Sequence, residues 1–372
     1  MDIAKNYLID ARKALPHFPE IKRYCEALLP AIAAQLTPNE SLHIIITAEN
    51  NSDSALTEHP NLSLHNTTAS PGTLKSALAV RQLFKELKPD IYHSADMYSA
   101  CSGKAKTVAT IHEACPITLP LNLNTLKRKL FFRLITQHKL RNVSQIIAIS
   151  ANILKTYPTS LHSNRSTIIH YGTAPEFKPQ DLEIVERVKA KYTLPDKFML
   201  IIEADSDIHN LTTILDAIQA TDFTETAPLV IAGYGSHNAN ITRLIKQRKM
   251  TARVHQTGEI EKKDMPALYC AAYALLFPNR VTGNGLPILE AMACGTPVIC
   301  SSLPSLTEIT GEAATLVHPT DKHEWRQAIN TAMLSLSWHD DSRANILKHI
   351  QRFTWDKAAV ATLAVYRDLE SL

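Results

Sequence analysis

Glycine is scarce in this sequence and unevenly placed. Only 10 of the 372 residues are glycine, about 3 % where roughly 7 % is usual. Seven of the ten lie between Gly233 and Gly311, whereas the first 171 residues contain only Gly72 and Gly103. Glycine lets the backbone approach a phosphate closely. A loop that binds phosphate through its backbone is therefore expected only in the second half of the chain.

Long apolar runs and cysteine pairs are also missing. The longest apolar run, Ala267–Phe277, is well short of the roughly 18 residues that span a bilayer. The first residues, Met1–Lys5, lack the basic and then apolar pattern of a signal peptide. The six cysteines form no Cys-x-x-Cys pair, so neither a zinc ribbon nor a disulfide framework is indicated. We therefore expect a cytoplasmic protein with reduced, mostly buried thiols.

Acidic residues are absent from Ala114 to Pro175, which leaves this stretch strongly basic. Its cations are Lys127, Arg128, Lys129, Arg133, Lys139, Arg141, Lys155 and Arg165. The spacing of leucines predicts an amphipathic helix over Thr125–Arg141. Such a helix suits an anionic membrane surface, with Lys127, Arg128, Lys129 and Arg133 facing the lipid at the inner side of the membrane. A solvated helix face with its counter-charges elsewhere in the fold explains the pattern equally well.

Apolar segments that alternate with amphipathic ones predict an α/β protein. The strands expected are 42–47, 91–93, 107–111, 146–149, 198–202, 228–232, 274–277 and 297–300, with helices at 21–36, 73–87, 212–220, 238–249 and 286–294. Two such runs predict two doubly wound domains, 1–173 and 174–355, each with a mainly parallel sheet. A last helix within 356–372 is expected to pack back on the first domain. Ligands of such folds bind outside the carboxyl ends of the strands, which we expect to face the cleft between the domains.

The segment Thr282–Ser301 carries the clearest chemical pattern. A strand runs into a loop with Gly283 and Gly285, and Pro287 then stands near the first turn of a helix. The amides of a helix start favour an anion, and Glu290, one turn further, can accept two hydrogen bonds from a diol. This pattern predicts a site for a negatively charged or hydroxyl-rich ligand. Glycines that only permit a tight turn between strand and helix remain the alternative.

Many ordered motifs make the sequence resemble glycosyltransferase family 4, whose members are retaining enzymes of the GT-B fold. In the first half the matching motifs are Ile9-Asp-Ala-Arg12, Arg23-Tyr24, Thr110-Ile-His112-Glu113, Ile147-Ala-Ile-Ser150 and Tyr171-Gly172. In the second half they are Leu229–Gly235, Pro266–Tyr269, Gly283–Val298, Leu306–Glu308, Pro319–Asp321 and Phe353–Trp355. The resemblance covers nearly the whole chain and implies two Rossmann-like domains.

The resemblance also implies a nucleotide-diphosphate-sugar donor and a saccharide or lipid-linked acceptor, with no further cofactor and no metal. It implies that Glu290 binds the donor ribose, that His112 points at the donor sugar, and that the amides of Asn284–Leu286 contact sugar and phosphate. It assigns Gly283, Pro287, Gly233, His209 and Asn210 to the donor side as well. Glu20 and Lys22 belong to the loop on the acceptor side. In the family, the donor phosphate is proposed to assist the incoming hydroxyl.

Several functional positions depart from the family pattern. The family has two glutamates separated by seven residues, and Thr282 stands at the first of these two positions. It also has an arginine and a lysine after the first strand of the second domain. In Glu203–Leu211, Ala204 or Ile208 stands at the position of the arginine and His209 at that of the lysine. Two unit charges about 4 Å apart interact by roughly 4 kcal/mol at an effective dielectric constant of 20, so the loss of cations beside a diphosphate weakens its binding. We therefore expect the diphosphate to bind less tightly near residues 203–209 than in the family.

The acceptor-side positions depart from the family as well. Glu20-Ile21-Lys22 stands where the family has two glycines flanking an apolar residue, and Tyr171 replaces an asparagine. Two functions therefore remain open. One is a retaining glycosyltransferase in which Thr282 and His112 contact the transferred sugar. The other is a catalytically degenerate homologue that serves as a non-catalytic partner of an active glycosyltransferase or of a membrane complex.

Other functional classes have weaker signals. Asp205-Ser-Asp207 is a lone acidic tripeptide, too short to predict a metal site. Gly233-Tyr-Gly235 has no third glycine, which argues against NAD. No serine lies in a Gly-x-Ser-x-Gly motif, which argues against a hydrolase of that kind. The net charge of +3 is too small to indicate a nucleic-acid partner.

Overall fold

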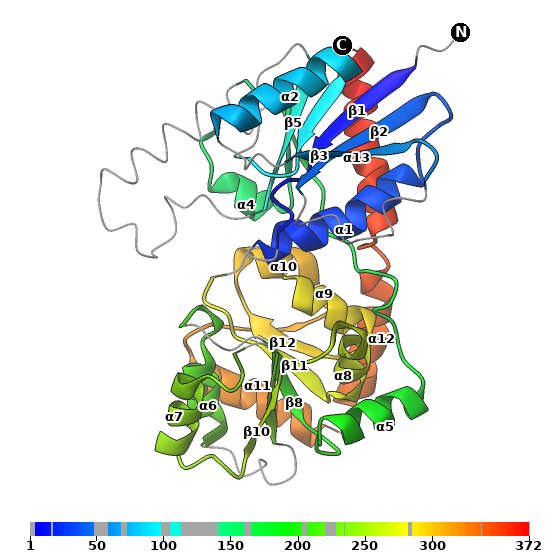
Figure 1. Cartoon of the computed structure of the whole chain (residues 1–372). Helices are drawn as coiled ribbons and strands as arrows, with labels where there is room; N and C mark the ends of the chain where they lie inside the picture. The colour runs from blue at the N-terminus through cyan, green and yellow to red at the C-terminus, as the bar shows by residue number, and fades with distance from the viewer. Residues whose placement is uncertain are drawn as a thin grey trace. The chain divides into compact units, whose positions relative to one another are not determined.

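The chain forms two compact units, each built on one parallel sheet (Figure 1). The computed structural model describes residues 4–15, 18–47, 59–67, 73–97, 105–112, 140, 142–159, 165–202, 207–219, 228–233, 235–281, 285–335 and 337–371. Unit 1 consists of Met1–Gly172 with Thr354–Leu372, and unit 2 consists of Thr173–Phe353. The chain therefore leaves unit 1 once and returns to it for its last helix.

Unit 1 has a seven-stranded parallel sheet of order β3-β2-β1-β4-β5-β6-β7. Its strands are β1 (Lys5–Asp10), β2 (Glu40–Thr47), β3 (Leu62–Thr67), β4 (Ile91–Ser94), β5 (Lys106–Ile111), β6 (Gln145–Ala148) and β7 (Ser166–Ile168). Its helices are α1 (Pro19–Ala33), α2 (Leu74–Leu87), α4 (Ala151–Lys155) and α13 (Trp355–Ser371). The order reverses between β1 and β4, which makes the sheet doubly wound.

Apolar strands and helix faces build the core of unit 1. Helix α2 packs Leu83, Phe84 and Leu87 against buried residues of β1, β2 and β4. Helices α1 and α13 lie side by side (Figure 1). Near the end of α13, Arg367 donates two hydrogen bonds of 2.8 Å to the Glu40 carboxylate. Burial raises the pKa of Glu40, but hydrogen bonds from Arg367, Thr37 and Tyr7 outweigh it and lower the pKa to about 2, so this carboxylate stays charged and holds the helix on the sheet.

Unit 2 has a six-stranded parallel sheet of order β10-β9-β8-β11-β12-β13. Its strands are β8 (Met199–Ile202), β9 (Leu229–Ala232), β10 (Val254–Gly258), β11 (Ala274–Phe277), β12 (Val298–Ser301) and β13 (Thr315–Val317). Its helices are α5 (Leu182–Lys191), η4 (Asp207–His209), α6 (Leu211–Gln219), α7 (Ala239–Gln247), η6 (Lys262–Asp264), α8 (Met265–Ala271), α9 (Leu286–Ala293), α10 (Pro304–Thr310), α11 (Lys322–Leu334) and α12 (Trp338–Ile350).

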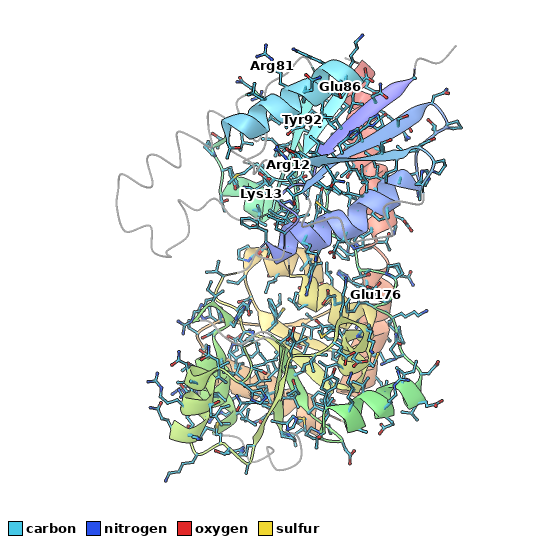
Figure 2. All side chains as sticks on the ribbon, in the orientation of Figure 1. Arg12, Lys13, Arg81, Glu86, Tyr92 and Glu176 are labelled. Atoms are coloured by element: carbon cyan, nitrogen blue, oxygen red, sulfur yellow. The ribbon has the colours of Figure 1, made fainter. Side chains whose placement is uncertain are left out.

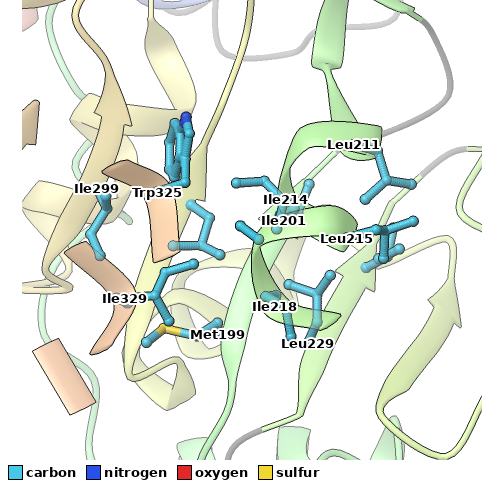
Figure 3. Close-up of a cluster of buried hydrophobic side chains, with 14 of the residues drawn as sticks. Met199, Ile201, Leu211, Ile214, Leu215, Ile218, Leu229, Ile299, Trp325 and Ile329 are labelled. Carbon is cyan, nitrogen blue, oxygen red and sulfur yellow. The ribbon is translucent and has the colours of Figure 1, made fainter. Parts of the chain in front are cut away.

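A large apolar cluster holds unit 2 together (Figure 3). Helices α6 and α11 face the sheet through residues at helical spacing, among them Ile214, Ile218, Trp325 and Ile329. The indole of Trp325 is fully buried, and its Nε1–H donates to the carbonyl of His318 at 3.1 Å. Burying apolar surface contributes roughly 25 cal/mol per Å² to stability. The cluster therefore stabilises the packing of these helices on the strands, whose carboxyl ends carry the candidate site.

The prediction of two doubly wound, mainly parallel α/β units is confirmed. Helix α5 lies in a range, 173–196, that contains none of the helices expected from the sequence. The expected helix 21–36 begins and ends earlier, at Pro19 and Ala33, with Pro30 inside it. The helix predicted over Thr125–Arg141, with its cations, lies outside the described residues apart from Leu140. In the described part of the chain, no helix is long and apolar enough to cross a membrane.

Candidate functional site

The carboxyl edge of the unit 2 sheet has the topology of a binding site. The strand order reverses between β8 and β11, which lie next to each other. Parallel α/β sheets bind ligands at such a switch point, beyond the carboxyl ends of the strands. Here η4 follows β8, residues 278–281 follow β11, and α9 begins shortly after. Of the residues predicted from the sequence, His209 ends η4 and Asn210 follows it, while Gly285 is the N-cap of α9 and Glu290 lies within that helix.

Gly285 shapes the start of helix α9. It is the N-cap residue with φ +60°, in the left-handed region that favours glycine. A Cβ on Gly285 would lie 2.5 Å from Ile309 Cδ1, so the end of the Ile309 side chain on α10 would have to move to accommodate one. Pro287 stands in the first turn, where its missing N–H removes no helical hydrogen bond. Thr282, Gly283 and Asn284 lie outside the described residues.

Glu290 is held in place by a tyrosine from the neighbouring helix. Tyr269, on α8, donates its hydroxyl proton to Glu290 Oε2 at 3.0 Å. The tyrosine is fully buried and Glu290 is only 7 % exposed. Phe177 packs edge-on against the Tyr269 ring at a centroid distance of 6.0 Å. Since the tyrosine binds one carboxylate oxygen, the carboxylate has a fixed orientation.

Asn210 ties three loops together. Its backbone is left-handed, with φ +54°, and its side chain is 3 % exposed. Nδ2 donates to the carbonyls of Pro278 at 3.0 Å and Pro319 at 2.5 Å. Oδ1 accepts from Thr213 Oγ1 at 2.7 Å and from Arg280 Nε at 2.9 Å. The amide therefore has both of its protons and both lone pairs in use, and it positions the loops after β8, β11 and β13.

Arg280 was missed by the sequence analysis. Its backbone N–H donates to the carbonyl of Ile208 at 2.9 Å, and its Nε donates to Asn210. These two bonds place an arginine beside the loop in which the sequence shows only His209 as a basic residue. The one available signal was a cation three residues after the end of a buried strand, at the carboxyl edge of the sheet.

Gly233 lies directly after β9 at the same edge. It has φ +97°, and its amide donates to the carbonyl of Gly258 at 3.0 Å. Its own carbonyl accepts from the amide of Ser236 at 3.1 Å. Gly233 thus makes a tight turn after the strand, and its contact with a donor remains a prediction.

Unit 1 also gathers polar side chains at its carboxyl edge (Figure 2). Arg12 forms a buried ion pair with Asp10, with Nε at 2.8 Å from Oδ1 and Nη2 at 2.5 Å from Oδ2. The hydroxyl of Tyr92 donates to Asp10 Oδ2 at 2.8 Å. Lys13 lies 3.7 Å from the carboxylate of Asp96. These charges are paired within the unit, so the network stabilises the edge of the sheet.

His112 is a buried member of the same edge. Its Nε2 donates to the carbonyl of Ala95 at 2.6 Å, which leaves Nδ1 to accept the hydroxyl proton of Tyr171. Burial lowers the pKa of His112 to about 4, so the imidazole is neutral at pH 7. Both ring nitrogens are engaged with the protein, and a sugar contact through His112 requires one of these bonds to break. Tyr24 packs edge-on against the imidazole at 4.7 Å.

His93 is a second buried histidine that the sequence analysis did not single out. Its Nε2 lies 2.8 Å from Thr110 Oγ1, and its Nδ1 bonds to the hydroxyl of Tyr366 on α13. Burial lowers its pKa to about 3. Thr110 in turn bonds to the hydroxyl of Tyr24 at 3.0 Å. His93 therefore joins the last helix to the sheet.

The remaining predicted residues are those of the acceptor-side loop and of the basic segment. Glu20 and Lys22 belong to the first turns of α1, and Lys22 is 3.3 Å from the carboxylate of Glu26. Lys127, Arg128, Lys129 and Arg133 lie outside the described residues. Among the residues that the structure describes, no group of three or more His, Cys, Asp or Glu side chains is arranged to hold a metal ion.

Family models match both units. The model described as glycosyltransferase family 4 matches residues 39–177, and the model described as glycosyl transferases group 1 matches residues 185–349. The chain is 26 % identical over 293 residues to O-antigen chain mannosyltransferase B of Escherichia coli, covering 76 % of this chain and 75 % of that protein. It is 25 % identical over 313 residues to the serotype-specific mannosyltransferase WbdA of Escherichia coli, covering 77 % of this chain but only 38 % of that longer protein.

Solved structures share the fold. Sucrose-phosphate synthase from Thermosynechococcus elongatus superimposes with a TM-score of 0.78 and 18 % identity, over 99 % of both chains. HepE of Anabaena, in complex with UDP-glucose, superimposes with a TM-score of 0.71 and 16 % identity, over 97 % of this chain and 99 % of that one. The sheet topology, the family models over both units and these likenesses agree: the chain has the GT-B fold and belongs to glycosyltransferase family 4.

Proposed function

We propose that this glycosyltransferase transfers a sugar from a nucleoside-diphosphate donor to a saccharide or lipid-linked acceptor, with retention of configuration, and that unit 2 holds the donor. The observation that carries the proposal is the carboxyl edge of the unit 2 sheet. There, the glycine-capped start of α9 and the fixed carboxylate of Glu290 lie within two turns of one helix. Both suit a ligand that combines phosphate with vicinal hydroxyls.

Glu290 and the start of α9 serve different parts of such a donor. A carboxylate accepts two hydrogen bonds from the 2′- and 3′-hydroxyls of a ribose, and the Tyr269 hydroxyl limits its rotation. The amides of the first helical turn suit the phosphate and the hydroxyls of the sugar, because a helix N-terminus carries partial positive charge. Gly285 allows close approach, since it has no side chain.

The relatives support a nucleotide-sugar donor and suggest the sugar to test first. Two of them are named mannosyltransferases and one solved structure holds UDP-glucose. We therefore place mannose first among the candidate sugars. The acceptor we expect is a growing saccharide, in keeping with the O-antigen named for one relative.

In the proposed reaction, the bond between the anomeric carbon and the diphosphate oxygen breaks. The oxygen of an acceptor hydroxyl bonds to the same carbon from the same face, and its proton passes to the leaving diphosphate. The chain contributes position and charge stabilisation. His112 is neutral at pH 7, so in this scheme it acts as a hydrogen-bond partner and not as a cation.

The first experiment is donor hydrolysis by the purified chain. GDP-mannose, UDP-glucose and ADP-glucose are incubated with wild type, Glu290→Gln and Glu312→Gln. The last variant is the control, because it removes an exposed carboxylate beyond the end of α10. We expect one donor to be cleaved, with the retained anomer released first in the proton NMR spectrum. Glu290→Gln should slow cleavage at least tenfold and Glu312→Gln should not. Absence of cleavage and of nucleotide binding across the panel would favour the non-catalytic homologue.

A lipid-linked acceptor also calls for contact with the membrane surface. The basic segment 127–133 is the sequence feature that we assign to this role. Wild type should sediment with vesicles containing phosphatidylglycerol and not with neutral vesicles. Replacing Lys127, Arg128 and Lys129 by glutamine should abolish this sedimentation. If wild type stays in the supernatant with both kinds of vesicle, the membrane contact is refuted and the proposed transfer still stands.

A further inference from the structure

Arg280 is a cation held at the carboxyl edge of unit 2 by bonds that leave its tip available. The side chain is exposed, and its Nε bonds to Asn210 while its backbone N–H bonds to Ile208. None of the residues that the structure describes accepts a hydrogen bond from Nη1 or Nη2 or pairs with the guanidinium as an acid. With respect to the described residues, the four terminal donors of the arginine are therefore available to a ligand.

The anchoring of Arg280 is more than a surface hydrogen bond usually provides. Asn210, its partner, is buried and spends its remaining hydrogen bonds on Pro278, Pro319 and Thr213. Through Asn210 the loops after three strands fix one end of the guanidinium. A guanidinium held at Nε loses less entropy when its terminal nitrogens bind a ligand. This arrangement is suited to recognition of a planar or tetrahedral oxyanion.

The position of Arg280 narrows the ligand to the phosphates of the donor. Arg280 bonds to Ile208 in η4 and to Asn210 directly after it, and it precedes the N-cap Gly285 of α9 by five residues. Arginine binds phosphate through two parallel hydrogen bonds. The η4 loop, followed by Leu211, contains only His209 as a basic residue among its described members. An arginine from the neighbouring strand end supplies the positive charge that the sequence of the loop does not.

We propose that Arg280 binds the diphosphate of the nucleotide sugar and that Asn210 is the positioning residue that holds it. This rests on the proposed function of unit 2 as the donor site. The terminal nitrogens of Arg280 contact the phosphate nearest the sugar, which becomes the leaving group, while Glu290 holds the ribose. A nucleoside diphosphate then gains from Arg280, and a nucleoside monophosphate, which lacks that phosphate, does not.

Titration calorimetry with ADP, GDP, UDP and the matching monophosphates tests whether Arg280 favours the diphosphate. The proteins are wild type, Arg280→Gln, Arg280→Lys and Arg187→Gln, where Arg187 is an exposed arginine of α5 outside the site. Wild type and Arg187→Gln should bind one diphosphate at least tenfold more tightly than its monophosphate. Arg280→Gln should weaken the diphosphate ten- to hundredfold and change the monophosphate less than threefold. Arg280→Lys, which keeps the charge without the Nε anchor, should fall between.

The failures of the two proposals can be told apart. If wild type binds a diphosphate and Arg280→Gln binds it within twofold of wild type, the role of Arg280 is refuted and the donor site stands. If Arg280→Gln loses diphosphate and monophosphate equally and melts at lower temperature than Arg187→Gln, Arg280 is structural and its role is refuted as well. If wild type binds none of the six nucleotides, both proposals fail.

Discussion

The two sheets have related topologies but use their carboxyl edges differently. In unit 1 the polar side chains at that edge bond to one another. Arg12 pairs with Asp10, and His112 spends both ring nitrogens on Ala95 and Tyr171. In unit 2 the edge presents a glycine-capped helix start and Arg280, whose terminal donors have no partner among the described residues. A sheet edge stabilises the fold where its charges pair within the unit, and it can bind a ligand where donors are left over.

Glycine usage follows the same division. In the described part of the chain, six glycines have positive φ and all lie in unit 2, among them Gly233, Gly258 and Gly285. Gly172 is the one glycine among the described residues of unit 1. Positive φ at glycine allows tight turns directly after strands and before helices. In unit 1 the helix start at α4 is capped by the Ser150 side chain instead. Among the described residues, glycines with positive φ therefore occur in unit 2, the proposed donor unit, and not in unit 1.

The largest effect is expected where unit 1 cannot accept a side chain. A Cβ on Gly172 would lie 2.1 Å from the backbone N of Trp355 and 2.3 Å from the carbonyl carbon of Thr354. Backbone must move to make room, so Gly172→Ala should lower the free energy of unfolding by about 3 kcal/mol in urea denaturation. Gly311→Ala, where φ is +51° but the nearest atom is 3.4 Å away, should cost about 1 kcal/mol. Equal losses for the two variants would contradict the steric explanation.

The buried histidines of unit 1 should make stability depend on pH. Burial lowers the pKa of His112 to about 4 and of His93 to about 3, while both titrate near 6.5 when unfolded. The unfolded chain therefore binds more protons below pH 6.5, and stability is full above this pH and falls as the pH drops toward 4. Each histidine should cost about 2 kcal/mol between pH 7 and pH 5.

Urea denaturation at a series of pH values measures this dependence. His112→Gln should reduce the slope of unfolding free energy against pH by about one proton near pH 5, whatever its effect on stability at pH 7. Ser150→Ala, which removes a helix cap and no titratable group, serves as the control and should leave the slope unchanged. An unchanged slope in His112→Gln would show that the imidazole is protonated in the folded chain.

In unit 2 the loss of one hydroxyl should affect binding and not folding. Tyr269→Phe keeps the ring contact with Phe177 and removes the hydrogen bond to Glu290. We expect KM for the donor to rise about tenfold, which corresponds to about 1.4 kcal/mol, with kcat changed less than threefold. Tyr273→Phe, which removes a hydroxyl bonded to the Ala332 carbonyl at 2.8 Å, is the matched control. If both variants raise KM equally, the orientation of Glu290 does not depend on Tyr269.

The smallest effect concerns the helix caps. Ser150 accepts hydrogen bonds from the amides of Asn152 at 3.1 Å and Ile153 at 3.3 Å. Ser150→Ala should lower the free energy of unfolding by about 1 kcal/mol and leave nucleotide binding unchanged. For Gly285→Ala we expect weaker nucleotide binding as the main effect, because the new Cβ contacts Ile309 and displaces the start of α9. Calorimetric titration of both variants checks the contrast, and loss of binding in Ser150→Ala would contradict it.

Much of the fold could be predicted because the central strands are buried on both faces. Ala274–Phe277 and Ile91–Ser94 are fully buried, so they appear in the sequence as apolar runs. The edge strands β3 and β10 are half-exposed, with sequences Leu-Ser-Leu-His-Asn-Thr and Val-His-Gln-Thr-Gly. Because of these polar residues, β3 and β10 did not appear as apolar runs in the sequence. Strands β7 and β13 were missed because each has only three residues.

The site was predictable only where its residues are close in sequence. Gly285, Pro287 and Glu290, at the start of α9, lie within six consecutive residues. Arg280 and Asn210 are 70 residues apart, and only the adjacent ends of β8 and β11 bring them together. The pairing of Tyr269 with Glu290 was hidden in the same way, because it joins two helices. The burial of His112 depends on Ala95 and Tyr171, which no local pattern connects to it.

Hydrogen exchange with and without nucleotide is the most direct test of whether the carboxyl edge of unit 2, and not that of unit 1, binds the donor. The chain is exchanged in deuterated buffer alone and with saturating ADP, GDP or UDP, using the one that binds most tightly. Slower exchange should appear in peptides covering 207–211, 278–281 and 285–293, with β1, β4 and β5 unchanged. Protection that appears only at the strand ends of unit 1, or nowhere in unit 2, would contradict the assignment of the donor site.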